Sequence, residues 1–240
     1  MSAKIMLGFL FLFLALLGIG TAWSNYQEKR EASVRDIRLK VQSAKARGER
    51  QLQLPAPIPF YAGVRDVDDA LGHYSTVIAY PTLKHSQLNA DSTSLETWYK
   101  FKVTDFLSHP EQPHVCESCK HAENIPPEVL PVNEDELIVK RGGGSLEVDG
   151  VRVYVKDASF PDYQIGQNYL LFVIVDLTSR IAFVELGPQG VSLINSNGKL
   201  DPVGPSDTKL NASLQKRFAR IDDLRDALKF RKFARQQYQR

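Results

Sequence analysis

The residues best suited to chemistry are two histidines and two cysteines that fall within eight positions. They are His114, Cys116, Cys119 and His121, in a polar stretch flanked by prolines. In an oxidising compartment, two cysteines separated by two residues are expected to form a small-ring disulfide that pins the loop. Thiolates and imidazoles are also preferred zinc ligands, so the same four side chains could hold Zn²⁺. The sequence predicts the Cys116–Cys119 disulfide, no metal or other cofactor, and zinc as the alternative.

Two other kinds of cysteine chemistry fit the neighbouring residues less well. A thiol–disulfide oxidoreductase places its reactive cysteine at a helix N-terminus in a thioredoxin-like setting, and neither is predicted here. Covalent haem attachment needs a histidine directly after the second cysteine, where this chain has Lys120. The chain contains no Gly-x-Ser-x-Gly nucleophile elbow. We therefore expect no catalytic residues, although a hydrolase site that forms only in three dimensions stays open.

The chain around the cysteines favours β-structure. Short runs of alternating or apolar residues predict strands at 75–80, 97–106, 136–140, 145–148, 151–155, 169–175, 181–186 and 191–195. Asp149-Gly150 and Asn197-Gly198 are typical of type I′ hairpin turns. The glycines at 142–144 indicate a bulged hairpin turn rather than a phosphate-binding loop, because no Gly-Lys-Ser/Thr follows them. Many short, closely spaced strands predict a barrel or sandwich, mainly β with flanking helices (α+β).

The sequence also resembles a group of uncharacterised bacterial exported proteins that carry an OB-like β-barrel. The resemblance rests on the Cys116/Cys119 pair and on four short motifs within residues 64–203. They are Thr-Trp-Tyr-Lys-Phe at 97–101, Arg-Gly-Gly-Gly at 141–144, Tyr-Leu-Leu-Phe at 169–172 and Gly-Pro-Gln-Gly at 187–190. It implies a small OB-like antiparallel barrel and export, and it carries no known activity or catalytic residue.

Residues 5–27 form an uncharged, largely apolar run that is long enough to span a bilayer. The run predicts either a transmembrane signal anchor or a cleaved signal peptide, with Lys4 as the positive flank and a small-residue cleavage site at 20–22. The basic residues that follow would keep the body in the cytoplasm under the positive-inside rule, whereas the signal-like start favours export. We expect a membrane-anchored or exported protein with its body on the extracytoplasmic side.

Composition divides the rest of the chain. The prediction is a signal anchor or signal peptide at 1–27, a basic helical spacer at 28–53, a Pro-rich linker at 54–63, an acidic β-barrel domain at 64–203 and a basic C-terminal helix at 204–240. The spacer is expected to be a solvated helix, because its apolar stripe is thin. Apolar residues at helical spacing from Leu210 to Leu228 predict an amphipathic C-terminal helix that packs on the core.

Charge is distributed unevenly between these parts. Residues 24–50 carry a net charge of +4 and residues 206–240 carry +6, whereas residues 51–205 carry −9. An acidic middle would repel phosphates, so we expect no nucleic-acid partner. The basic arms could contact anionic lipids. These features predict a non-enzymatic binding or structural module of the bacterial envelope that recognises another, unknown envelope protein, with a zinc or thiol-redox protein as the alternative.

Overall fold

The structure is a computed structural model of the 240-residue chain. It describes residues 36–55, 63–110, 125–130, 132–155, 160, 162–176, 180–184, 186–204 and 208–238. The apolar run at 5–27 and all four residues of the predicted disulfide or zinc loop lie outside these ranges. No helix within them combines the length and hydrophobicity needed to cross a membrane.

The fold is mixed α+β, built on a small closed barrel with flanking helices, as the strand pattern predicted. Its five barrel strands are β2 (Ser75–Leu88), β3 (Leu95–Ser108), β4 (Glu136–Gly142), β7 (Tyr169–Asp176) and β8 (Ile181–Phe183). Around the barrel their order is β2-β3-β4-β8-β7, and β7 pairs with β2 to close it. The β4–β8 pair is parallel and the other four pairs are antiparallel.

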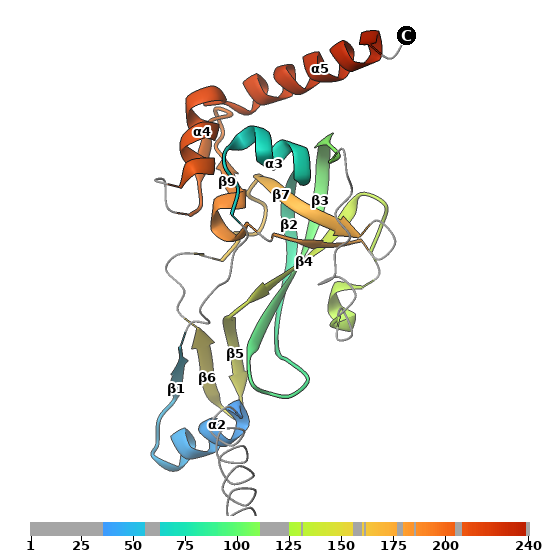
Figure 1. Ribbon diagram of the computed structural model, residues 1–240. Helices are drawn as coiled ribbons and strands as arrows, with labels where there is room; N and C mark the ends of the chain where they lie inside the picture. Colours follow the sequence, from blue (N-terminus) through green and yellow to red (C-terminus); the bar gives the residue numbers. More distant parts are fainter. Residues whose placement is uncertain are drawn as a thin grey trace, which may run out of the picture.

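Strands β2 and β3 form a hairpin that is longer than the barrel itself. Register shifts between Thr76 and Ala79, and again between Pro81 and Leu83, bend and twist the pair. A proline cannot donate a ladder hydrogen bond, so Pro81 is tolerated at an irregular position of this kind. Beyond it the hairpin leaves the barrel and reaches a second, smaller sheet (Figure 1).

Alternation along the strands separates two apolar layers. Side chains such as Tyr99, Phe101 and Leu171 point inward and fill the barrel, and none of these three exposes any surface. Neighbours of opposite parity, such as Ile78 and Phe172, point outward and are covered by three helices. These helices are α3 (Val67–His73), α4 (Lys209–Arg217) and α5 (Ile221–Tyr238). The barrel therefore has a packed interior, and its helices lie on one outer face.

The smaller sheet contains β1 (Gln51–Leu54), β6 (Val151–Val155) and β5 (Gly144–Val148), in that order. Helix α2 (Ile37–Ala46) packs against it through Ile37, Val41 and Ala44, which expose 1% of their surface or less. Among the described residues, the helix in the predicted spacer ends at Ala46, and one of its faces is covered by the smaller sheet rather than solvated. The thin apolar face of α2 is covered because β1 pairs with β6, about 100 residues later in the sequence, and the helix packs on the sheet that they form.

The glycines at 142–144 do not form the hairpin turn that was predicted. Strand β5 pairs with β6 rather than with β4, so the glycines carry the chain from the barrel to the smaller sheet. Gly143 and Gly144 both have positive φ, and the Thr97 hydroxyl donates to the Gly143 carbonyl at 2.6 Å. A Cβ on Gly144 would overlap that hydroxyl oxygen. Glycine is required here by close approach to β3 as well as by backbone conformation.

The two predicted hairpins are both present, but only one has the expected turn. Asp149 and Gly150 have φ values of 50° and 79° between β5 and β6, as a type I′ turn requires. The second hairpin joins β9 (Val191–Ile194) to β10 (Leu200–Pro202). There only Gly198 has positive φ, so the longer loop closes through a glycine bulge instead.

The C-terminal helix is broken into α4 and α5 at residues 218–220. Thr208 caps α4 by accepting from the Asn211 amide, while Phe218 is buried and marks the end of this helix. Helix α5 then crosses above α3 and the end of β3 (Figure 1). Its first half packs on the core through Ile221 and Leu224. Helices α2 and α5 lie at opposite ends of the molecule in this view.

Candidate binding cleft between β3 and α5

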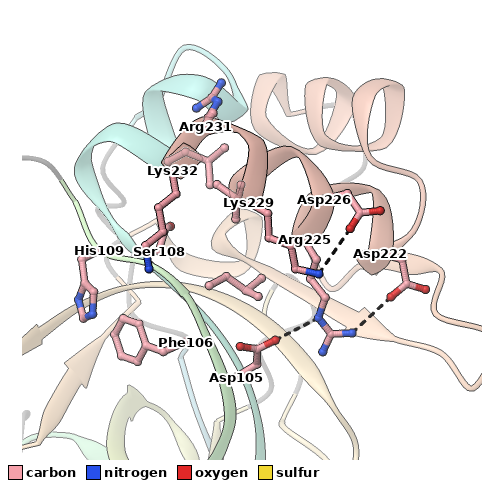
Figure 2. Close-up of a pocket in the computed structure, with 13 residues that line it drawn as sticks. Asp105, Phe106, Ser108, His109, Asp222, Arg225, Asp226, Lys229, Arg231 and Lys232 are labelled. Atoms are coloured by element: carbon pink, nitrogen blue, oxygen red, sulfur yellow. Dashed lines mark hydrogen bonds and ion pairs between the residues drawn. The ribbon is translucent and has the colours of Figure 1, made fainter. Parts of the chain in front are cut away.

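A cleft of about 1080 Å³ separates the end of β3 from α5. It is lined by Leu71 of α3, by residues 105–109 at the end of β3, and by one face of α5. The α5 side chains that line it are Asp222, Arg225, Asp226, Leu228, Lys229, Arg231 and Lys232. Figure 2 shows these groups facing one another across the cleft.

One end of the cleft is held by ion pairs centred on Arg225. Its Nε donates to Asp105 Oδ2 at 3.0 Å, and its Nη1 donates to Asp222 Oδ1 at 3.3 Å. The first of these bonds joins α5 to the outermost residues of β3 (Figure 2). Both side chains of the Arg225–Asp105 pair are about one-third exposed, so the pair adds little free energy. Its main effect is to fix the distance between helix and strand.

A second set of ion pairs links the three helices. The Asp68 carboxylate of α3 accepts from Arg217 of α4 and from Arg231 of α5. Partial burial works to raise the pKa of Asp68, but the hydrogen bonds and charges of the two arginines outweigh it and hold the pKa below its usual range. Asp66 caps the start of α3 by accepting from the Asp68 and Asp69 amides.

The other end of the cleft is basic and less fully paired. Lys229 reaches Asp226 at 3.6 Å, but both side chains are more than three-quarters exposed. Within the described ranges, neither Lys232 nor His109 has a carboxylate at ion-pair distance. Lys232 extends toward the end of β3, and the His109 ring stacks on Phe106 at 4.2 Å (Figure 2). The buried Ser108 hydroxyl has no hydrogen-bond partner in the described part of the chain.

A separate polar cluster closes one end of the barrel interior. Arg141 of β4, which is only 7% exposed, and Lys84 of β2 both donate to Asp162 in the β6–β7 connection. The Arg141 guanidinium also lies over the Phe160 ring, 4.9 Å from its centroid. Burial works to raise the pKa of Asp162, but the hydrogen bond and charge of Lys84 and the charge of Arg141 hold it below the usual aspartate range.

Tyr99 lies beside this cluster with its hydroxyl buried. The hydroxyl is close enough to feel the charges of Asp162 and Arg141, yet it makes no hydrogen bond of good geometry among the described residues. Burial, followed by the negative charge of Asp162, raises the pKa of Tyr99 far above that of an ordinary phenol. Asp162 pairs with both Arg141 and Lys84, while the buried Arg141 Nε has no hydrogen-bond partner among the described residues. We interpret the cluster as a structural plug of the barrel because its charges are paired with one another.

The outer face of β3 and β4 carries a row of ion pairs between strands. Lys140 binds Glu96 at 2.6 Å, Lys100 lies 4.0 Å from Glu136, and Lys102 pairs with Asp135. Lys140 also lies over the Trp98 ring, 5.2 Å from its centroid. The cations on this face are therefore already occupied.

The site residues predicted from the sequence come after His109, the last residue of the 105–109 wall of the cleft. His114, Cys116, Cys119 and His121 fall in the undescribed stretch 111–124, which follows β3 directly. Elsewhere, across the described ranges, no group of three or more His, Cys, Asp or Glu is placed to hold a metal ion. The sequence pattern predicted a basic C-terminal helix but gave no sign of the cleft. The cleft's two walls meet only in the folded chain.

Comparison of the chain with protein-family models, with curated proteins and with solved structures gives no match. Of the expected resemblance, the structure bears out a small five-stranded β-barrel, and no family is identified.

Proposed function

We propose that the protein is a non-enzymatic binding module of the bacterial cell envelope, and that the β3–α5 cleft is its recognition site. The cleft itself carries this proposal: it has room for several residues of a partner, and one end is fixed by Arg225. The other end presents Lys232 and His109, for which the described part of the chain supplies no carboxylate partner. A concave surface with a rigid frame and a few available polar groups suits recognition.

We also propose that the barrel is OB-like. Its first three strands lie side by side in chain order, its fifth strand pairs in parallel with its third, and its fourth closes onto its first. This order and these directions favour an OB-like barrel, a scaffold that serves binding in many proteins. Fold alone does not identify a ligand, so the assignment of the site rests on the cleft.

The ion pairs on the outer face of β3 and β4 support placing the site at the cleft rather than on that face. OB-folds commonly bind ligands on the face of their second and third strands, which are β3 and β4 in this chain. A ligand there would have to displace ion pairs such as Lys140–Glu96 and Lys102–Asp135. At the basic end of the cleft, Lys232 makes no ion pair with a described residue that a ligand would have to displace.

The apolar run at 5–27 supports an envelope role, because it is long enough to anchor the protein in a bilayer or to direct its export. In either case we propose that the body of the protein, with its cleft, lies on the extracytoplasmic side. Contact with anionic lipid is then proposed for the N-terminal basic arm at 24–50, while the C-terminal arm is available to another envelope component.

Site-specific photocrosslinking in the native host tests the binding function. The full chain carries p-benzoylphenylalanine in place of His109 at the cleft, or in place of the exposed Lys216 on α4 as the matched control. We expect a discrete higher-mass adduct from position 109 and none from position 216. The absence of an adduct at 109, or equal yields from both positions, would contradict the proposal.

The Cys116/Cys119 pair with its flanking histidines keeps zinc or thiol-redox function as a second candidate, because thiolates and imidazoles are preferred zinc ligands. The native protein is alkylated under non-reducing conditions and its intact mass is measured, which distinguishes the disulfide from the zinc site. Two protected cysteines without metal favour the proposed disulfide, whereas alkylation only after chelation favours zinc.

A further inference from the structure

The charges lining the cleft are segregated along its length. At one end Arg225 pairs with Asp105 and Asp222, so this end presents no excess of positive charge (Figure 2). Lys229 and Lys232 lie one and two turns further along α5. Lys229 is offset by Asp226 at 3.6 Å, but Lys232 adds a positive charge. Arg231 shares the single carboxylate of Asp68 with Arg217. A ligand that enters this end therefore meets net positive charge, although residues 51–205 as a whole are acidic.

Apolar groups lie between and beside these charges. Leu71, Leu228 and the Phe106 ring, stacked with His109, also line the cleft. Partner side chains gain most binding energy where apolar anchors are buried and charges at the rim set the orientation. The lining thus suits a segment that carries both carboxylates and at least one apolar or aromatic side chain.

The size of the cleft argues against a small anion as the intended ligand. Pockets for drug-sized molecules generally measure about 300–1,000 Å³. At about 1080 Å³, the cleft would be left mostly empty by a single phosphate or carboxylate. A stretch of several residues in an extended or turn conformation fits this space.

Among the described side chains of α5, residues 221–232, the placement of the exposed aromatic residue disfavours a lipid surface. Phe230 is 72% exposed and would be the natural group to insert into a bilayer, but it does not line the cleft. The cations at the cleft and this apolar group do not share one membrane-facing surface.

We propose that the β3–α5 cleft binds an acidic segment of a partner protein, with carboxylates paired to Lys229 and Lys232 and an apolar side chain seated between Leu71, Leu228 and Phe106. This inference rests on the proposed binding function and specifies its ligand class. Under this proposal, α5 determines which charge the partner segment must carry, and the barrel supports the helix.

The test uses the full-length purified protein and three fluorescent eight-residue peptides. They share the same leucine and phenylalanine positions and differ only in carrying four Glu, four Gln or four Lys. We expect the Glu peptide to bind saturably and at least about tenfold more tightly than the Gln peptide, with the Lys peptide weaker still. Raising the salt concentration should weaken the Glu peptide most. Equal binding of all three peptides, or preference for the Lys peptide, overturns the inference.

Matched variants locate the binding. Lys229→Glu/Lys232→Glu should weaken the Glu peptide by about tenfold or more, while Lys209→Glu/Lys216→Glu, two exposed lysines of α4 outside the cleft, should stay within about twofold. Phe230→Ser should leave peptide binding unchanged. Equal effects of the two lysine pairs would overturn the assignment to the cleft. Absent peptide binding, together with phosphatidylglycerol-vesicle binding that Phe230→Ser abolishes, would assign the helix to lipid instead.

The two proposals fail in different ways. A protein crosslinked at position 109, combined with no preference for the Glu peptide, leaves the binding function standing and overturns the acidic ligand. No crosslink at position 109 and no peptide binding overturn both.

Discussion

Arg225 of α5 donates from Nε to Oδ2 of Asp105 at the end of β3, at 3.0 Å, across 120 positions of sequence. This single bond connects the last helix to the second barrel strand at the point where the cleft begins. The cleft is therefore a property of how α5 docks, and the stability of that docking can be measured separately from global stability.

Replacement of Arg225 by methionine should loosen α5 without unfolding the barrel. The pair with Asp105 is about one-third exposed, so we expect a loss of global stability below about 1 kcal/mol. Amide hydrogen exchange in residues 225–232 should nevertheless rise several-fold, because local opening of a docked helix costs less than global unfolding. Lys216→Met on α4 is the control. Unchanged exchange in α5 would show that the apolar contacts of Leu224 and Ile221 hold the helix alone.

A double-mutant cycle on Arg141 and Asp162 should show strong coupling. Asp162→Asn leaves the buried Arg141 guanidinium without its carboxylate, and since Asp162 is itself 43% exposed we expect a loss of about 1–3 kcal/mol rather than the full cost of a buried pair. The double variant Arg141→Met/Asp162→Asn should recover part of that loss, because no buried charge remains unpaired. Urea unfolding of the four proteins measures the coupling. Strictly additive effects would mean that solvent already screens the pair.

Stability should fall on acidification through Asp162 and Asp68. Both carboxyls have a folded-state pKa below their ordinary value, so the folded protein binds fewer protons than the unfolded chain. Their contribution is complete above the unfolded-state pKa of about 4 and is lost as the pH falls through the lower folded-state pKa. Asp162→Asn should flatten the stability profile below about pH 5 relative to the parent. A variant whose profile stays parallel to the parent's would contradict this assignment.

Tyr99 should impose the opposite dependence at alkaline pH. Its pKa is raised by burial and then by the charge of Asp162, so the folded state holds the phenolic proton more tightly than the unfolded chain. This contribution is complete below the ordinary phenol pKa of about 10 and is lost as the pH rises toward the folded-state value. Tyr99→Phe should therefore reduce the loss of stability above about pH 10 while costing less than about 1 kcal/mol at neutral pH. Ultraviolet titration that shows normal ionisation of every tyrosine in the folded protein would refute it.

Gly144→Ala should destabilise the junction between the two sheets. The added Cβ would meet the Thr97 hydroxyl and would also place alanine at φ +121°, so we expect a loss of about 2 kcal/mol or more. Gly150→Ala is the matched control, since it has positive φ but no neighbour within 4 Å, and should lose only about 1 kcal/mol. Thermal unfolding compares them. Equal losses at both positions would mean that backbone strain alone explains the triple-glycine motif.

The parts of this fold that the sequence predicted are those set by local pattern. The local pattern located β6 to the residue and β3 to within two residues at each end, and Asp149-Gly150 specified its turn because that geometry needs positive φ at both positions. Strand β1 was missed because four residues between a helix and prolines hold too little pattern, and its pairing with β6 spans about 100 positions. The same limit hid the cleft, since nothing local relates Arg225 to Asp105.

Hydrogen–deuterium exchange of the full-length protein, with and without detergent-solubilised native envelope, tests the central claim most directly because it assumes no contact surface in advance. We expect the envelope to protect residues 105–109 of β3 and 225–232 of α5, and the protection to be lost in Lys229→Glu/Lys232→Glu. Protection confined to the outer face of β3 and β4 or to the smaller sheet, with the cleft unchanged, would contradict the account.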